Sequence, residues 1–195
     1  MRIGVDFDGV IIDTEQNFRY YVEKSMYERG QEPITRTNRD VFRNYQDIIT
    51  DGIWLTFLNL WNTVTNQSGF IVGGKEILQK LRKEGHKLFL ITARGAFENF
   101  NDILSAEKKL KEFDFKFDDV FFKVNNKAQF CVDSKIDVMI DDCNRHCKKL
   151  SAAGIKTLYF RDRNYEDLNH PNIVTVDNWF HIYKEIIKLD KAKNS

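Results

Sequence analysis

Apolar residues in this chain gather in short runs that end in glycine or polar residues, and amphipathic stretches separate the runs. The first run, residues 2–7, predicts a buried strand with Asp6 and Asp8 at its carboxyl end. From Gly73 onward, strand patterns alternate with helix patterns. Further strands are expected at residues 86–92, 120–123, 136–140, 156–160 and 173–176. Helices are expected at residues 75–84, 97–113, 127–134, 145–153 and 179–189.

Strands that alternate with helices in this way predict an α/β fold. Parallel strands need crossover connections, which are almost always right-handed and place helices on the faces of the sheet. We therefore expect a three-layer, Rossmann-like core with a mostly parallel sheet and helices on both faces. The Lys-rich tail after Asp190 is expected to be frayed, as chain ends often are.

Residues 14–72 differ from the rest, because they contain helical patterns but no convincing strand. We expect a small helical cap inserted after the first strand, with residues 1–13 and 73–195 forming the core domain. Asp13 is expected to cap or orient the first helix of this insertion. The apolar positions of the two helical patterns are Phe18, Tyr21, Val22 and Met26, and then Ile53, Leu55, Phe57, Leu58 and Trp61. Aromatic side chains at such spacing usually pack inside the protein, and this applies to Tyr20, Tyr45, Trp54 and Trp61.

Composition and charge limit the partners of the protein. The 195 residues, of which 42% are hydrophobic and 13% aromatic, fit one globular domain with a local insertion. A formal net charge of +1 gives no strong field for a polynucleotide or an anionic membrane. No apolar stretch approaches the roughly 18 residues that span a bilayer. A strand that begins at Arg2 leaves no room for a secretory signal, so we expect a cytoplasmic location.

The cysteines are expected to be structural thiols. Cys131, Cys143 and Cys147 form an odd set, which does not suit a disulfide framework in a reducing compartment. Cys143, His146 and Cys147 are close enough in sequence to suggest metal ligands. No second Cys/His pair completes a tetrahedral set, so a zinc site is not expected.

Several of the expected strands end in residues that suit a phosphate group and a divalent metal. Parallel strands bring their carboxyl ends to one edge of the sheet, where open α/β sheets bind ligands. Residues that are distant in sequence can therefore meet in one pocket. The residues concerned are Asp6 and Asp8 on the first strand, Thr92 on the second, Asp141 and Asp142 on the fourth, and Lys127 at the start of a helix.

These residues, in this order, resemble a known family. D-F-D-G-V, I-T-A-R-G, Lys127 and I-D-D are similar to the four motifs of the haloacid dehalogenase superfamily of phosphohydrolases. The resemblance covers residues 1–13 and about 73–177. The strings V-M-I-D-D and V-D-N-W also resemble those of the 5'(3')-deoxyribonucleotidases and related bacterial nucleotidases. The chain departs from the mammalian deoxyribonucleotidases in Ala93-Arg94 after the threonine and in the composition of its cap.

The resemblance implies a magnesium-dependent phosphomonoesterase that forms an aspartyl-phosphate. Asp6 would be the nucleophile, and Asp8 would protonate the leaving group and then activate water. Mg²⁺ would be held by Asp6, the backbone carbonyl of Asp8, Asp141 and Asp142, with Asp142 preferred as the direct ligand and Asp141 as a neighbouring or water-mediated one. The phosphate would be bound by the Thr92 hydroxyl, the Ala93 backbone N–H and the Lys127 ammonium.

Three assignments have alternatives. Lys123 and Lys135 compete with Lys127 as the motif lysine. Arg94 could reach a substrate phosphate or base, or could be an exposed surface arginine. Phe18 could stack on a nucleobase, but packing within the cap is the preferred interpretation.

The expected substrate is a small phosphomonoester, with a nucleoside or deoxynucleoside monophosphate preferred. Phosphatase action on a sugar phosphate or on a nucleic-acid end is an alternative that shares the core. A third hypothesis is a non-catalytic protein that binds a phosphorylated ligand. Neither a polynucleotide nor a membrane is expected as a partner, and the sequence does not indicate an oligomeric state.

Overall fold

The computed structural model describes residues 1–30, 60–96, 102–161 and 168–194. Its centre is a six-stranded sheet with the order β3-β2-β1-β4-β5-β6, in which every pairing is parallel. This confirms the predicted α/β class. The strands are β1 (Arg2–Val5), β2 (Lys87–Ile91), β3 (Asp119–Phe121), β4 (Val138–Asp141), β5 (Lys156–Phe160) and β6 (Ile173–Val176).

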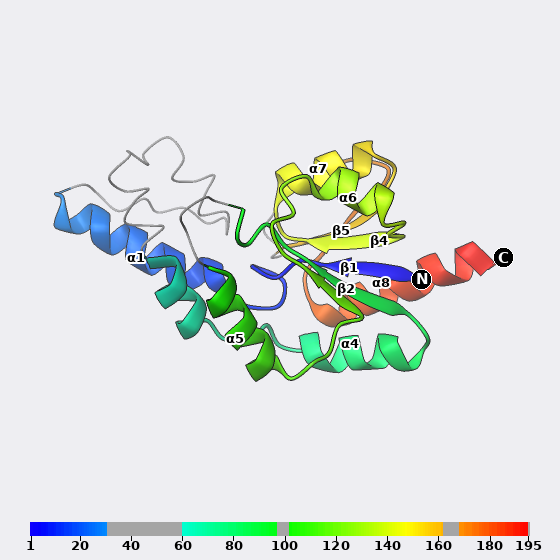
Figure 1. Ribbon diagram of the computed structural model, residues 1–195. Coiled ribbons are helices and arrows are strands. Elements are labelled where there is room, and N and C mark those ends of the chain that lie inside the picture. The colour runs from blue at the N-terminus through cyan, green and yellow to red at the C-terminus, as the bar shows by residue number, and fades with distance from the viewer. Residues whose placement is uncertain (31–59, 97–101, 162–167, 195) are drawn as a thin grey trace.

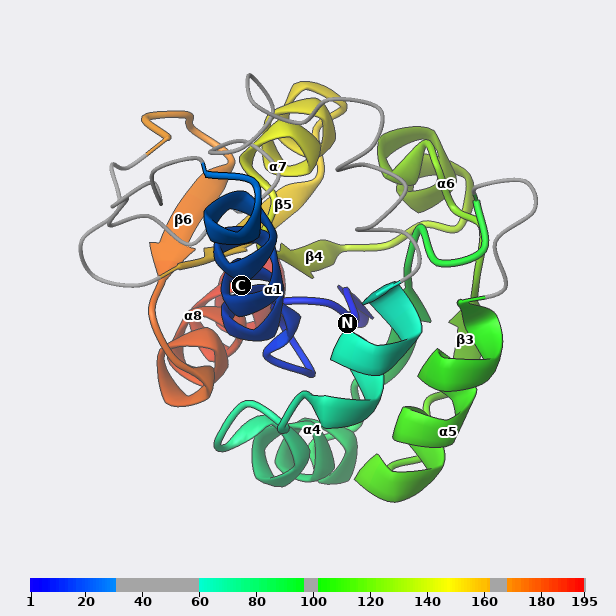
Figure 2. The same cartoon turned by 90° about the vertical axis from the view of Figure 1, so that its left-hand side faces the viewer.

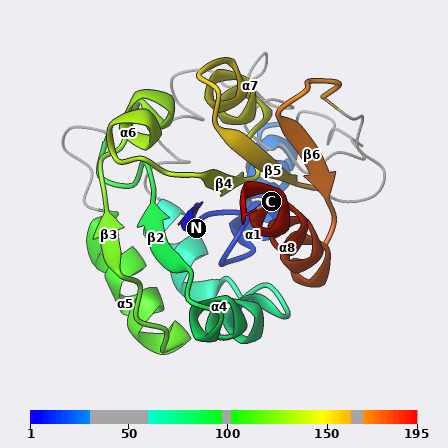
Figure 3. The same cartoon turned by 90° about the vertical axis from the view of Figure 1, so that its right-hand side faces the viewer.

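Helices cover both faces of the sheet, as expected from right-handed crossovers. Viewed along the strands, α4, α5 and α8 lie on one face and α6 and α7 on the other (Figure 3). The helices are α1 (Thr14–Glu28), α4 (Gly74–Lys83), α5 (Ile103–Phe113), α6 (Lys127–Asp133), α7 (Asn144–Ala152) and α8 (Trp179–Asn194). None of the described helices combines the length and the apolar character that a bilayer crossing requires.

Alternate residues of the central strands pack into two separate cores. Ile3, Val5 and Leu90 are fully buried with α4 and α8 on one face, whereas Ile91 and Met139 are buried on the face of α6 and α7. Because both faces are covered, the central strands are almost continuously apolar, and this is why the sequence pattern located them. Gly4 lies where β1 and β4 approach closely, since a Cβ there would be 2.6 Å from Met139 Sδ.

The C-terminal tail differs from the prediction. Helix α8 continues to Asn194, so the expectation of a frayed tail after Asp190 was wrong for the described residues 190–194. The Lys193 ammonium lies 2.7 Å from Asp137 Oδ1 at the amino edge of the sheet, and this ion pair supports the last turn. Both termini lie at that edge (Figure 1). The predicted helix at 97–113 is observed as α5, and residues 97–101 lie outside the described ranges.

The chain leaves the core after β1 and returns beside its point of departure. Asp13 N donates to Gly69 O at 2.9 Å, Ile71 N donates to Ile11 O at 2.9 Å, and an antiparallel bridge joins Ile12 to Phe70. We call these paired segments, residues 11–13 and 69–71, the neck, and residues 14–68 the insertion. The division of the chain into a core domain and a cap domain stays a prediction.

Two helical segments of the insertion pack on each other beyond the carboxyl edge of the sheet. Figure 2 views this edge with α1 in front of the strand ends. Phe18, Val22 and Met26 of α1 form an apolar cluster with Val64 of the helical segment 60–67. Asp13 occupies the N-cap position of α1, but its side chain makes no capping hydrogen bond. Of the predicted helical positions, Ile53, Leu55, Phe57 and Leu58 lie outside the described residues, as do Tyr45 and Trp54.

Candidate active site

Lys127 joins two carboxylates at the carboxyl edge of the sheet. Asp6 directly follows β1, Asp141 is the last residue of β4, and Lys127 is the first residue of α6. The Lys127 ammonium lies 2.7 Å from Asp6 Oδ2 and 2.7 Å from Asp141 Oδ2. All three side chains are buried, whereas Lys123 and Lys135 are exposed. The structure therefore places Lys127, and neither alternative lysine, in the cluster.

Burial and neighbouring charges shift the pKa values of Asp6, Asp141 and Lys127 in opposite directions. Burial raises the pKa of Asp6 to about 6, although the Lys127 charge opposes the shift. Burial also disfavours ionisation of Asp141, but Lys127 and then His146 outweigh it and hold the pKa of Asp141 below its usual range. The two carboxylates likewise overcome the burial of Lys127 and raise its pKa. Lys127 and Asp141 are therefore a charged pair, and Asp6 gives up its proton less readily.

A third carboxylate lies beside this pair. Asp6, Asp141 and Asp142 each offer an oxygen, and these oxygens lie within 4.8 Å of one another. Burial raises the pKa of Asp142 well above its usual value, while the charge of Arg161 opposes the shift. Three carboxylates with one lysine form an electron-rich oxygen cluster, which is the donor type that Mg²⁺ prefers. The residues present thus fit a hard divalent cation.

Gly9 is required for the position of Asp142. Its backbone has φ of +67°, and a Cβ built on it would be 2.0 Å from Asp142 Oδ2. The turn after Asp8 therefore needs glycine both for its left-handed backbone and for the space that Asp142 occupies.

Asp8 contacts Arg94, which lies two residues after Thr92. Arg94 Nε donates to Asp8 Oδ2 at 2.8 Å, and Nη2 donates to Asp8 Oδ1 at 2.5 Å. The Arg94 side chain is 1% exposed, so the alternative of an exposed surface arginine was wrong. The alternative, in which it reaches a substrate, is not tested by these contacts. Asp8 itself is 25% exposed.

Thr92 and Ala93 follow β2 at the same edge. Thr92 is buried, and its Oγ1 accepts a hydrogen bond from Arg94 N at 3.2 Å. Its backbone is fixed by Thr92 N donating to Phe121 O and Val124 N donating to Thr92 O, both at 3.0 Å. A hydroxyl and the following backbone N–H at such a turn suit an anionic oxygen.

Arg161 was missed by the sequence interpretation. It follows β5, its side chain is 3% exposed, and its Nη1 lies 3.8 Å from Asp142 Oδ2 and 3.3 Å from Glu15 Oε2 in α1. Its Nε donates to the Tyr159 hydroxyl at 2.9 Å. The sequence pattern could have indicated it, because Arg161 directly follows a predicted strand and so lies at the same edge of the sheet as Asp6 and Thr92.

Phe18 lies in the insertion rather than against the carboxylates. It is 4% exposed, and its ring centre lies 4.6 Å from that of Trp61. This is the packing position that was preferred for it. The cysteines are free, as expected, with Cys131 and Cys147 buried.

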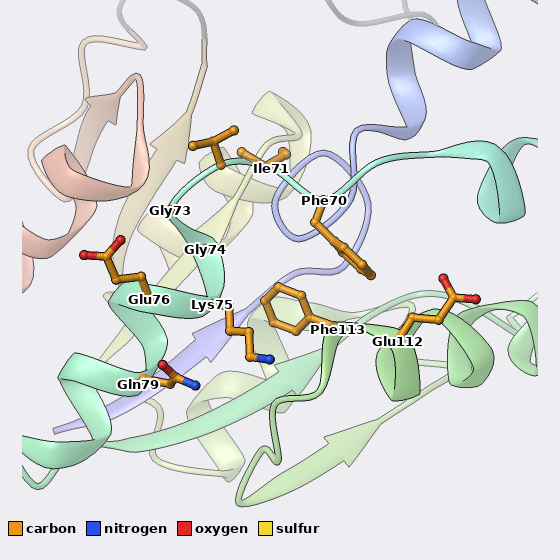
Figure 4. Close-up of a pocket in the computed structure, with 10 residues that line it drawn as sticks. Phe70, Ile71, Gly73, Gly74, Lys75, Glu76, Gln79, Glu112 and Phe113 are labelled. Carbon is orange, nitrogen blue, oxygen red and sulfur yellow. The ribbon is translucent and has the colours of Figure 1, made fainter.

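A hollow of about 470 Å³ lies away from the four motifs. It opens between the start of α4 and the end of α5. Figure 4 shows Phe70 and Phe113 facing each other there, with Lys75 near them. None of the motif residues lines this hollow, so its shape does not bear on the carboxylate cluster.

The fold and the clustered motifs define a class of enzyme. Residues 3–159 match the family of haloacid dehalogenase-like hydrolases. The chain belongs to this hydrolase family, as the four motifs indicated. The comparison with curated proteins found no match.

Solved structures of the family share the fold over nearly the whole chain. One is described as a predicted phosphatase from Clostridium acetobutylicum, with 15% identity, a TM-score of 0.69, and 96% of this chain and 98% of that chain covered. A haloacid dehalogenase-like family hydrolase from Streptococcus pneumoniae has 12% identity, a TM-score of 0.67 and 96% coverage of both chains. A HAD phosphatase from Thermococcus onnurineus has 15% identity, a TM-score of 0.59, and 95% and 97% coverage. At these identities the likeness concerns the fold alone.

Proposed function

We propose that this hydrolase is a magnesium-dependent phosphomonoesterase that forms an aspartyl-phosphate on Asp6. The observation that carries the proposal is the Lys127 ammonium at 2.7 Å from both Asp6 and Asp141, next to Asp142. A phosphate group is anionic, and buried carboxylates repel it. It can approach Asp6 only if positive charge nearby, such as that of Lys127, balances the negative charge. This requirement supports a phosphoryl-transfer site rather than a structural ion pair.

In the first step, an Asp6 oxygen forms a bond to phosphorus while the bond between phosphorus and the leaving oxygen breaks. The bonding electron pair goes to the leaving oxygen, which takes a proton from Asp8. Phe7 N donates to Asp6 Oδ1 at 2.8 Å and Lys127 holds Oδ2, so the nucleophile is held in one orientation. The alcohol then leaves.

In the second step, a water molecule gives a proton to Asp8 and attacks phosphorus. The bond between phosphorus and Asp6 breaks, so inorganic phosphate is released and the Asp6 carboxylate is restored. Thr92 Oγ1 and the Ala93 N–H would bind the phosphoryl oxygens throughout. Lys127 would supply a fixed positive charge beside the phosphoryl group.

Mg²⁺ would be held by Asp6, Asp142 and the backbone carbonyl of Asp8, and when bound it neutralises charge on the phosphoryl oxygens. Asp142 is favoured over Asp141 as the direct ligand. The Asp141 side chain is 0% exposed and holds Lys127 at 2.7 Å and Cys143 N at 2.9 Å, whereas the side chains of Asp6 and Asp142 are 9% and 19% exposed. Asp141 would therefore act as a neighbour that orients Lys127.

The substrate proposed is a small phosphomonoester, with a nucleoside or deoxynucleoside monophosphate preferred because of the V-M-I-D-D and V-D-N-W strings. Sugar phosphates and nucleic-acid ends remain the enzymatic alternatives, and a non-catalytic phospholigand binder is the alternative from another class. A net charge of +1 does not favour a polynucleotide track.

A turnover assay tests the proposal. Purified protein would be given p-nitrophenyl phosphate and a panel of nucleotides and sugar phosphates, with Mg²⁺ and with excess chelator. We expect phosphate release that requires Mg²⁺ and is lost in Asp6→Asn, together with an acid-stable, hydroxylamine-sensitive phosphoenzyme in the wild type. Release that persists in Asp6→Asn would reject the covalent mechanism, and tight phosphate binding without release would favour the non-catalytic alternative.

A further inference from the structure

Arg94 makes a two-point contact with Asp8 that a surface ion pair rarely achieves. Two parallel donors, Nε and Nη2, each engage one oxygen of the carboxylate, at 2.8 and 2.5 Å. A fork of this kind fixes both the position and the rotation of the carboxylate, whereas a single hydrogen bond leaves it free to rotate. The contact joins residues 86 positions apart, from the segments that follow β1 and β2.

The Arg94 side chain is itself held on several sides. The guanidinium carbon lies 4.9 Å from the ring centre of Trp61 and 5.5 Å from that of Phe7. Trp61 belongs to the insertion and Phe7 to the turn between Asp6 and Asp8. The guanidinium is therefore in cation–π contact with aromatic rings of both the core and the insertion.

The backbone around Arg94 is also tied down. Arg94 N donates to Thr92 Oγ1 at 3.2 Å, and Arg94 O accepts from Lys123 N at 2.7 Å. Gly95 N donates to Asp102 Oδ1 at 2.7 Å, which attaches the next residue to the start of α5. Side chain and backbone together give Arg94 little freedom, and this is the rigid support that a precisely placed reactive group requires.

We propose that Arg94 is a positioning residue for Asp8, which orients this carboxylate toward the leaving-group oxygen of the phosphomonoester. This inference deepens the proposed function and rests on it. Both engaged nitrogens of Arg94 point to Asp8, whereas Nη1 is buried and has no hydrogen-bond partner among the described residues. The positioning role therefore stands beside the substrate-binding role expected from the sequence and does not replace it. A protonated Asp8 keeps acceptor capacity on both oxygens, so the fork can hold it in both protonation states and the same placement serves both proton transfers.

The quality of the leaving group separates this role from phosphate binding. An alkyl oxygen is a poor leaving group and needs the proton from Asp8, whereas dinitrophenolate leaves without protonation. A residue that acts through Asp8 should matter for the first ester and little for the second. A residue that binds the phosphoryl group should matter equally for both.

The experiment compares glycerol phosphate with 2,4-dinitrophenyl phosphate by kcat/KM, which reports the steps through departure of the leaving group. Arg94→Lys keeps the positive charge but cannot form the fork. We expect it to lower kcat/KM by about 100-fold for the alkyl ester and by less than about threefold for the dinitrophenyl ester, in line with the roughly 10²–10⁴-fold contribution of general acids. Because both esters are measured with one enzyme sample, a partly unfolded variant would change both values alike.

Two further variants sharpen the test. In Asp8→Asn, the change Arg94→Lys should cause no additional loss, because the group that Arg94 positions is no longer an acid. Arg82→Lys is the matched control: Arg82 also pairs with an aspartate, Asp118 at 3.4 Å, and lies over an aromatic ring, Phe115 at 4.4 Å, but at the other edge of the sheet. It should leave the ratio of the two kcat/KM values unchanged.

Equal losses for both esters, no loss for the alkyl ester, or full additivity with Asp8→Asn would each overturn the positioning role and leave the proposed function standing. A wild-type protein that hydrolyses neither ester in Mg²⁺ would overturn both.

Discussion

The two edges of the sheet place aspartates in different electrostatic situations. At the amino edge, Asp118 accepts a hydrogen bond from Leu88 N at 2.9 Å and Asp137 accepts one from Arg2 N at 2.7 Å. Burial opposes the ionisation of both, but these amides and neighbouring Lys and Arg side chains outweigh it and lower the pKa of each carboxyl. At the carboxyl edge, Lys127 lowers the pKa of Asp141 in the same way, but burial raises the pKa of Asp6 and Asp142.

This difference in pKa indicates different roles for the aspartates, in fold stability on the one hand and in the candidate site on the other. A carboxyl whose pKa falls on folding stabilises the fold at neutral pH, and one whose pKa rises costs stability there. The aspartates of the amino edge therefore stabilise the fold, whereas Asp6 and Asp142 at the carboxyl edge carry a cost that a bound cation can offset. Strained or costly groups of this kind concentrate at functional sites.

The largest expected effect is loss of activity from the carboxyl edge. Asp6→Asn removes the proposed nucleophile and should lower turnover by about 10⁴-fold or more, a loss of at least about 5.5 kcal/mol in transition-state stabilisation. Steady-state assays with p-nitrophenyl phosphate measure it. The control Asp137→Asn should keep turnover within about twofold and instead lower the free energy of unfolding by about 1 kcal/mol, since its contacts with Arg2 N and Lys193 are weakened. Equal turnover in the two variants would remove the distinction between the edges.

A pair of glycines gives the next effect. Gly9→Ala introduces a Cβ 2.0 Å from Asp142 Oδ2 and should lower activity by about 100-fold, about 2.7 kcal/mol. Gly154→Ala has the same kind of backbone, with φ of +84°, but nothing lies within 4 Å of the added Cβ. It should cost about 1 kcal/mol of stability through backbone strain and leave activity unchanged. Urea unfolding and turnover assays measure the two quantities, and similar activity losses in both variants would attribute the Gly9 effect to strain alone.

Cation binding should stabilise the carboxyl edge. Mg²⁺ at about 100 times its Kd should raise the free energy of unfolding by about 2.7 kcal/mol, because it binds the folded state. Thermal unfolding with and without Mg²⁺ measures the shift. Asp142→Asn should abolish most of it, while Asp118→Asn, at the other edge, should retain it. A wild-type protein whose melting temperature does not respond to Mg²⁺ would contradict the assignment of the cluster.

The smallest effect concerns pH at the amino edge. Because the pKa of Asp118 is lowered in the folded protein, its contribution to stability is present above the unfolded value of about 4 and is lost as pH falls through the folded pKa. Asp118→Asn should therefore cost about 1 kcal/mol at pH 7 and less near pH 3. Urea unfolding across this range measures it, with the exposed Glu107→Gln as a control. A constant difference between Asp118→Asn and wild type at all pH values would assign the effect to packing.

The sequence predicted the elements that depend on local pattern. The bounds of β5 and β6 were predicted to the residue, because both strands are flanked by clear turn residues. The rule that parallel strands share a carboxyl edge also predicted, from the sequence, that Asp6, Thr92 and Asp141 lie at one edge of the sheet. Lys127 could be located because it begins a helix at that edge.

Contacts between distant side chains could not be predicted in the same way. The Arg94–Asp8 fork depends on rotamers fixed by Trp61 and Phe7, and spacing along the chain does not encode them. Arg161 reaches Glu15 across 146 positions, through the placement of α1 over the sheet. The ion pair of the helical tail, Lys193 with Asp137, likewise joins residues 56 positions apart.

The neck has a consequence for how such enzymes can diversify. Because Ile12 and Phe70 are bridged, the two ends of the insertion are pinned side by side whatever lies between them. Replacing the insertion by a longer or shorter one would change the entropy of closing that loop only slowly with length. The insertion, residues 14–68, could thus be replaced as a whole, while Asp6 keeps its position after β1.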